Sequence, residues 1–300
     1  MKISLIGLSG CGKTSIYLTT LGGMVHNKVK KLSPTIMYDV RNHNYLGLQI
    51  SLWDFGGQEK YREAYLESPE VLANTTVLIC VLDLHCPQDF NDAKTYFEDV
   101  YSTIKQNGGN PITYIFYHKY DTEDYPNEQL QKNLAEAKAL SIFPKLKPVS
   151  HLTSIYKQNK LSEIMKQILI ADFENLRHNV EQAQKSLQEL HSKIIVCDIN
   201  GNIVTHNIRG FTTGMKLRED LWDYISGCNI LRETFLTTKS AKFSAKSHEK
   251  KLDLYIFSYI LCVLIVAEEN SPTDPQEYID NLLNEMQIFA DLIIEADKAE

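Results

Sequence analysis

Glycines, a lysine and a threonine near the start of the chain have the types and spacing needed to bind phosphate. Residues 7–14 read Gly-Leu-Ser-Gly-Cys-Gly-Lys-Thr, between an apolar run at 3–6 and a stretch at 15–21 that can be helical. The glycines allow a tight turn whose N–H groups face phosphate oxygens, and the helix N-terminus adds partial positive charge. We expect Lys13 to reach the β- and γ-phosphates of a nucleotide and Thr14 to offer its hydroxyl to Mg²⁺.

Further residues of the same chemistry follow in the next 45 positions. Thr35 lies in a loop that a proline keeps extended, and its place in the chain suits a second Mg²⁺ ligand beside the γ-phosphate. A strand predicted at 47–53 ends in Trp-Asp-Phe-Gly-Gly-Gln. We expect Asp54 to hold Mg²⁺ through water and Gly57 to offer its N–H to the γ-phosphate. Gln58 stands where a glutamine can orient the attacking water.

A third group of residues could recognise the base. The strand predicted at 114–117 leads into His-Lys-Tyr-Asp, ending at Asp121. A carboxylate here can accept hydrogen bonds from N1 and N2 of guanine, and adenine has no such pair of donors. The stem of Lys119 can cover the base plane, and N–H groups at 153–156 could meet the guanine carbonyl. Asp121 therefore argues against a P-loop ATPase or kinase.

The elements that must position these residues indicate an α/β fold. The apolar run at 77–83 is typical of a strand buried on both faces of a parallel sheet. Further strands are predicted at 3–6, 38–45, 47–53, 114–117 and 149–152, and helices at 15–21, 90–105, 130–140 and 161–169. The segment 59–74 reads as a helical stretch that Pro69 interrupts. We expect a mostly parallel sheet with helices on both faces.

Composition limits the remaining possibilities. The chain has 300 residues, enough for two domains, and its 43% hydrophobic and 23% charged content is typical of a globular protein. A net charge of −7 argues against general nucleic-acid binding. The six cysteines show no C-x-x-C spacing, so we expect a reducing compartment and no structural metal. The chain starts directly with a predicted strand, so we expect no signal peptide. The near-apolar run 254–267 is shorter than a spanning helix, so we expect no direct membrane insertion and a cytoplasmic protein.

These motifs, in this order, resemble those of the Ras-like GTPases, and most of all the Rag/Gtr type. His118 is the main pointer, since most of the superfamily has asparagine there and Rag-type proteins carry His-Lys-x-Asp. Residues 53–58 look like the Rag A type and 152–156 more like the C type, so the chain departs from both. The resemblance implies GTP or GDP with Mg²⁺ as ligands. It implies nucleotide contacts from Ser9, Gly10, Cys11, Gly12, Lys13, Thr14, Ser15, Thr35, Gly57, His118, Lys119, Asp121, Ser154 and Ile155, metal ligands Thr14, Thr35 and Asp54, and catalytic roles for Gln58, Lys13 and Thr35.

The second half predicts a different, α+β domain. A polar helix from 172, a hairpin around Asn200-Gly201, a helix at 217–231, strands at 243–246, 252–257 and 261–267 and a helix from 274 follow in order. This layout looks like the roadblock (longin-related) domain that ends Rag-type GTPases. We predict a GTP-binding domain at 1–172 and a dimerisation domain at 173–300, in which no catalytic constellation is present.

The predicted function is a GTPase switch with a low intrinsic rate. In Gα-type proteins an arginine lies three residues before the switch threonine, and here that position is Leu32. Arg62 is close to Gln58 in sequence, but we expect it to be a solvated residue. The resemblance implies a second Rag-like chain or a second copy as dimer partner, a GTPase-activating protein or exchange factor, a roadblock-type scaffold, and a role in nutrient signalling. The alternative is a nucleotide-bound scaffold, or a polarity or trafficking module, with little hydrolysis.

Overall fold

The computed structural model of the chain describes most of the first 171 residues and selected segments beyond them. The described residues are 1–21, 29, 32–45, 48–122, 125–144, 146, 148–171, 178, 180–182, 184–185, 193–198, 203–207, 240–247, 250–257 and 261–268. The chain divides into two compact units, Met1–His43 with Gln49–Met165, and Asn44–Leu48 with Lys166–Glu300. Among the described residues, no helix is both long and apolar enough to cross a membrane.

The first unit is built on a six-stranded sheet within the described residues. The strands are β1 (Lys2–Ile6), β2 (Tyr38–Tyr45), β3 (Leu48–Phe55), β4 (Val77–Asp83), β5 (Ile112–His118) and β6 (Val149–Leu152), in the order β2-β3-β1-β4-β5-β6. β1 is parallel to both β3 and β4, and β5 is parallel to both β4 and β6. Because the strands from β3 to β6 run the same way, the loops that follow them lie at one edge, where open α/β sheets bind ligands.

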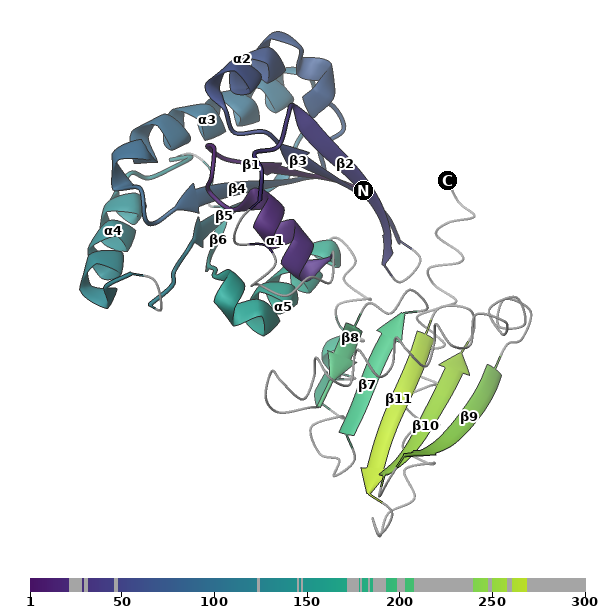
Figure 1. Cartoon of the computed structure of the whole chain (residues 1–300). Coiled ribbons are helices and arrows are strands. Elements are labelled where there is room, and N and C mark those ends of the chain that lie inside the picture. The colour runs from purple at the N-terminus through teal and green to yellow at the C-terminus, as the bar shows by residue number, and fades with distance from the viewer. Residues whose placement is uncertain are drawn as a thin grey trace. The chain divides into compact units, whose positions relative to one another are not determined.

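Helices cover both faces of this sheet. They are α1 (Lys13–Thr20), α2 (Glu59–Glu67), α3 (Phe90–Gln106), α4 (Asn127–Ala139) and α5 (Gln158–Leu169), with short 3₁₀ helices at Pro69–Leu72, Pro87–Asp89 and Ile155–Lys157. Figure 1 shows α2 and α3 on one face and α1 with the start of α5 on the other. The Gln158 amide fixes the start of α5 by donating to the Thr19 carbonyl of α1 at 2.8 Å.

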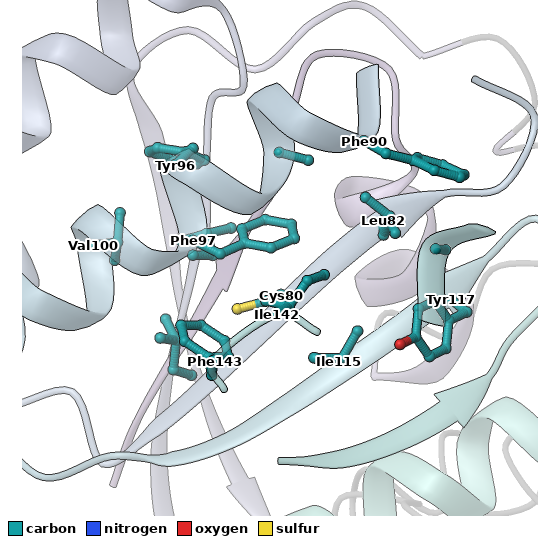
Figure 2. Close-up of a cluster of buried hydrophobic side chains, with 14 of the residues drawn as sticks. Cys80, Leu82, Phe90, Tyr96, Phe97, Val100, Ile115, Tyr117, Ile142 and Phe143 are labelled. Carbon is teal, nitrogen blue, oxygen red and sulfur yellow. The ribbon is translucent and has the colours of Figure 1, made fainter. Parts of the chain in front are cut away.

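The core between the sheet and α3 follows from the sequence pattern. The six residues from Val77 to Leu82 in β4 are all buried, as a central strand covered on both faces requires. α3 buries Phe90, Ala93, Tyr96, Phe97, Val100 and Ile104, which recur at helical spacing. Figure 2 shows the rings of Phe97 and Phe143 beside Cys80 of β4 and Ile115 of β5.

The expected mostly parallel sheet with helices on both faces is confirmed, and the differences concern element ends. α1 begins at Lys13, two residues before the predicted start, since Gly12 turns the chain directly into the helix. α4 begins at Asn127, just after Pro126, and three residues earlier than predicted. The interruption at Pro69 is confirmed, because α2 ends at Glu67 and a 3₁₀ helix follows.

The second unit contains an antiparallel sheet. Its described strands are β7 (Lys193–Asp198), β8 (Ile203–His206), β9 (Ser240–Ser247), β10 (Lys250–Phe257) and β11 (Leu261–Glu268), in the order β8-β7-β11-β10-β9. The hairpin partners β7 and β8 and the meander β9-β10-β11 are antiparallel, as predicted. The helices predicted from 172, at 217–231 and from 274 lie wholly or mostly outside the described residues, as does the Asn200-Gly201 turn.

Candidate functional site

A cavity of about 230 Å³ brings together the three stretches singled out for phosphate chemistry. Its lining comes from the glycine loop with the start of α1, from the loop before β2, and from the turn after β3. The lining residues are Ser9, Gly10, Gly12, Lys13, Thr14, Ser15, Val29, Leu32, Ser33, Pro34, Thr35, Gly57 and Gln58. Cys11 faces inward instead, since its side chain is buried and its Sγ lies 3.6 Å from the Lys13 Nζ.

Lys13 is buried under its own loop. Its Nζ donates to the carbonyl oxygens of Gly7 at 2.9 Å and Leu8 at 3.0 Å. These two bonds aim the ammonium group along the loop that would hold the phosphates. The third N–H of the ammonium points at Cys11 Sγ at 3.6 Å, a weak acceptor that a phosphate oxygen could replace.

Two hydroxyl side chains that line the cavity, those of Thr14 and Thr35, meet the buried carboxylate of Asp54. The Thr14 hydroxyl donates to Asp54 Oδ2 at 2.5 Å, the Thr35 hydroxyl lies 3.2 Å from the same oxygen, and the two hydroxyls are 3.0 Å apart. Asp54 is buried, and its Oδ1 has no hydrogen-bond partner among the described residues. Burial raises the pKa of Asp54, while the bonds from both threonines and the charge of Lys13 lower it in part.

This donor set fits a magnesium ion. Mg²⁺ prefers hydroxyl, carboxylate and water oxygens, and it usually keeps several waters beside one or two protein ligands and substrate phosphates. A divalent cation would also stabilise the buried Asp54 carboxylate, whose Oδ1 is otherwise unpaired in the described structure. Thr14 and Thr35 would hold the ion directly and Asp54 through water. When bound, Mg²⁺ neutralises charge on the β- and γ-phosphate oxygens.

Gly57 lies against the glycine loop so closely that a side chain has no room. A Cβ at this position would lie 2.3 Å from the Leu8 carbonyl carbon and 2.4 Å from Ser9 N, both backbone atoms. Gln58 follows in extended backbone at the N-cap of α2, and it lines the cavity. The loop before β2 is held nearby, because Gly56 N donates to the Met37 carbonyl at 2.6 Å and the Tyr65 hydroxyl donates to the same oxygen.

His118 connects the loop after β5 to the glycine loop. Its side chain is 2% exposed, and its Nδ1 shares a 2.9 Å hydrogen bond with the Thr153 hydroxyl. The other edge of the ring lies against Gly12, where an added Cβ would be 2.6 Å from His118 Cδ2. Gly12 also has φ +101°, so both its conformation and its neighbour require glycine. Burial and the charge of Lys119 lower the pKa of His118 to about 3, so the ring is neutral at physiological pH.

The remaining residues predicted to surround the base lie on two adjoining loops. Lys119 has φ +58°, and its Nζ pairs with Asp83 Oδ2 at 2.5 Å. Tyr120 N donates to the Thr153 carbonyl at 3.1 Å, which joins the loop after β5 to the loop after β6. Asp121 and Ser154 are buried, and Ile155 opens the 3₁₀ helix after Ser154. His118, Lys119, Asp121, Ser154 and Ile155 thus come from these two loops, and none of them lines the phosphate cavity.

Asp83 and the side-chain bond of Thr153 to His118 were not predicted from the sequence, and the prediction for Arg62 was wrong. Asp83 ends β4 and stands in register with His118 of β5, so its position at the carboxyl end of a parallel strand was a usable signal. Arg62 was expected to be solvated, but its side chain is only 14% exposed and pairs with Asp92 of α3. The reason is tertiary, because α2 packs beside α3.

Leu32 and Lys13 line the cavity, and no arginine does so among the described residues.

The parallel sheet, the glycine loop before α1 and the paired loops after β5 and β6 define a Ras-like GTPase. Residues 2–213 match the family model of the Gtr1/RagA G protein conserved region, and the chain belongs to this family. It is 25% identical over 254 residues to Ras-related GTP-binding protein A of Dictyostelium discoideum, covering 83% of this chain and 81% of that protein. It is 22% identical over 295 residues to GTP-binding protein GTR1 of Saccharomyces cerevisiae, covering 91% and 93%.

Among solved structures, the chain is similar to the small GTPase Arl6 (BBS3) of Trypanosoma brucei with bound GppNp, at 17% identity and a TM-score of 0.41. The match covers 54% of this chain and 91% of that one. As a member of the Gtr1/RagA family, the chain is a GTP-hydrolysing enzyme that binds GTP and GDP with Mg²⁺.

Proposed function

We propose that the chain is a guanine-nucleotide switch that hydrolyses GTP slowly. In this proposal the loop from Ser9 to Ser15 holds the phosphates, with Lys13 on the β- and γ-phosphates. Thr14, Thr35 and Asp54 hold Mg²⁺, and Gly57 donates its N–H to the γ-phosphate. Gln58 orients the attacking water. Lys119, Asp121, Ser154 and Ile155 form the guanine pocket, and His118 supports it from beneath.

One observation carries this proposal: Thr14 and Thr35 line the same cavity as Gly57 and Gln58, and both of their hydroxyls bond to the buried Asp54. Thr35 and Asp54 are 19 residues apart in the chain, and Thr14 and Asp54 are 40 apart, yet their oxygens lie within 3.2 Å. Gln58, the N-cap of α2, lines the same cavity, which a chance meeting of hydroxyl groups would not explain.

The absence of an arginine from the described lining of the cavity supports a low intrinsic rate. Charge that develops on the γ-phosphoryl group would then meet Lys13 and a Mg²⁺ held by Thr14 and Thr35, but no guanidinium from the described lining. In related enzymes such an arginine is worth about 10³ to 10⁵ in rate, or roughly 4 to 7 kcal/mol of barrier. We therefore expect unassisted turnover of about 10⁻⁴ to 10⁻² s⁻¹, by analogy with intrinsic GTPases, and acceleration by a partner protein.

We further propose that residues 173–300 form a roadblock-like dimerisation domain and 1–172 the GTP-binding domain. The antiparallel order β8-β7-β11-β10-β9 is compatible with such a domain. The partner would be a second Rag-like GTPase or another copy of the chain, chosen by nucleotide state. A GTPase-activating protein, an exchange factor and a roadblock-type scaffold would complete a cytoplasmic nutrient-signalling role, with recruitment to membranes through partners.

The test combines nucleotide competition with single-turnover hydrolysis. The native protein should bind GTP and GDP far more tightly than ATP, and Asp121→Asn should weaken both while letting xanthine nucleotides compete. Gln58→Leu should slow hydrolysis and leave GTP affinity nearly unchanged, because Gln58 acts on water rather than on the nucleotide. Equal affinity for ATP and GTP would refute the guanine pocket, and unchanged hydrolysis in Gln58→Leu would refute the role of Gln58.

The alternative is a nucleotide-bound scaffold, or a polarity or trafficking module, with little hydrolysis. Leu32 in the lining of the cavity, at the position of the arginine in Gα-type proteins, favours this reading of the site. The same single-turnover measurement distinguishes the two. Hydrolysis that a partner cannot accelerate, with GTP stably bound, would support the scaffold.

A further inference from the structure

Helix α2 directly follows the proposed water-orienting residue, Gln58. It spans nine residues, Glu59–Glu67, and Tyr65 is its one buried side chain. Gln58 stands at its N-cap without a side-chain hydrogen bond to the helix. A helix this short is marginal in water, so its position must come from tertiary contacts.

Arg62 supplies such a contact to α3. Its two terminal nitrogens donate to the two carboxylate oxygens of Asp92, each at 3.1 Å. The guanidinium carbon lies 5.3 Å from the centre of the Tyr96 ring, one turn further along α3. A two-bond pairing fixes both the direction and the distance of the guanidinium. The Arg62 side chain is 14% exposed and that of Asp92 is 57% exposed. Arg62 therefore packs against α3, while Asp92 is accessible to solvent.

The same residue is bonded directly to Gln58. Arg62 N donates to the Gln58 carbonyl at 3.1 Å, and Tyr61 N donates to it at 2.9 Å. Arg62 therefore stands one helical turn after Gln58, and the first turn of α2 cannot move on α3 without breaking the pair with Asp92. Tyr65, on the same side of the helix, donates to the carbonyls of Met37 and Gly56 and so restrains the other end.

We propose that Arg62, Asp92 and Tyr96 form an anchor that positions Gln58 for hydrolysis. All three are positioning residues, because they act through the backbone of Gln58 and not on the nucleotide. The inference rests on the proposed role of Gln58 in orienting water. An alternative role for Arg62 is that of a cis arginine that acts on the γ-phosphate and that the pair with Asp92 keeps away from it. The two roles predict opposite changes in the hydrolysis rate. Loss of Asp92 slows hydrolysis if the pair is an anchor and speeds it if Arg62 is freed to reach the γ-phosphate.

The experiment measures single-turnover GTP hydrolysis by the full-length protein in Mg²⁺, with dissociation constants for GTP and GDP. Asp92→Asn is the main variant, and it removes the charge while keeping the size. Asp99→Asn is the matched control, since Asp99 is an exposed residue of the same helix. We expect Asp92→Asn to slow hydrolysis roughly tenfold, within the ~100-fold that a 1 Å misplacement can cost. Both dissociation constants should stay within about twofold, and Asp99→Asn should behave as the native protein.

A second pair of variants separates positioning from a general loss of structure. In a Gln58→Leu background, Asp92→Asn should slow hydrolysis no further, because the anchor acts only through Gln58. Arg62→Lys keeps the positive charge but loses the two-bond pairing, and it should be slowed like Asp92→Asn. Melting curves will show whether both variants fold. If Asp92→Asn does not fold, Arg62→Lys tests the anchor in its place.

The outcomes are distinguishable. Slower hydrolysis in Asp92→Asn and Arg62→Lys, with no added effect in the Gln58→Leu background, supports the anchor. Native or faster hydrolysis in Asp92→Asn overturns it, and faster hydrolysis assigns Arg62 to the reaction instead. If Gln58→Leu itself hydrolyses GTP at the native rate, the proposed role of Gln58 fails, and this inference fails with it.

Discussion

The neutral, buried histidine at the end of β5 should make the protein sensitive to acid. His118 is fully buried, and its pKa falls from 6.5 to about 3, mainly through burial and then through the charge of Lys119, with Asp83 opposing. The folded protein thus binds a proton at His118 only near pH 3, whereas the unfolded chain binds it near pH 6.5. Between these values the unfolded state takes up more protons, so the free energy of unfolding must fall as the pH is lowered.

The size of this effect follows from the two pKa values. Each unit of difference between the two pKa values changes the free energy of unfolding by about 1.36 kcal/mol, and the full change is reached only at a pH below both values. Relative to pH 7.5, the linkage gives a loss of about 2 kcal/mol at pH 5 and about 4 kcal/mol at pH 3. These are upper values, because water entering the pocket would let the folded state accept the proton earlier.

The assay compares urea unfolding of the native protein and His118→Asn at pH 7.5 and pH 5, followed by tryptophan fluorescence in saturating GDP and Mg²⁺. Asparagine keeps a polar group that can reach the Thr153 hydroxyl but has no proton to gain. The native protein should lose about 2 kcal/mol more than the variant over this interval. His178→Asn, which removes an exposed imidazole, is the control and should keep the native pH dependence.

An equal pH dependence in native protein and His118→Asn would refute the reasoning. It would mean that His118 already accepts a proton in the folded state near its ordinary pKa. The hydrogen bond between His118 and Thr153 and the contact with Gly12 would then have to tolerate a charged ring.

Two further changes test the packing around the site. Gly57→Ala should weaken GTP binding by about tenfold or more, because its Cβ would overlap Leu8 and Ser9 backbone atoms and overpacking costs ~1–3 kcal/mol. Ser102→Ala, at an exposed position of α3, is the control in fluorescent-nucleotide titrations, and equal affinities of the two variants would contradict the close approach. Phe97→Ala should lower the free energy of unfolding by about 3–5 kcal/mol, since the ring is fully buried, and a loss below about 1 kcal/mol in urea would show that the core can collapse around it.

The sequence alone predicted the elements and motifs whose signal is local. The glycine loop, Thr35, Asp54 and Gly57-Gln58 were found because each motif depends on short spacing and on its neighbouring strand or helix. The buried run of β4 and the periodic face of α3 were predicted for the same reason. Hydrophobic periodicity reports which face an element buries, and this is enough to establish an α/β sheet with helices on both faces.

Only the tertiary structure decided which polar side chains meet. Lys119 pairs with Asp83 across 36 residues, His118 with Thr153 across 35, and Arg62 with Asp92 across 30. These partners follow from the order of β4, β5 and β6 and from α2 packing on α3, neither of which any local window contains. A charged or polar side chain has many possible partners of equal chemistry along the chain, and the sheet selects one by placing it within about 3 Å.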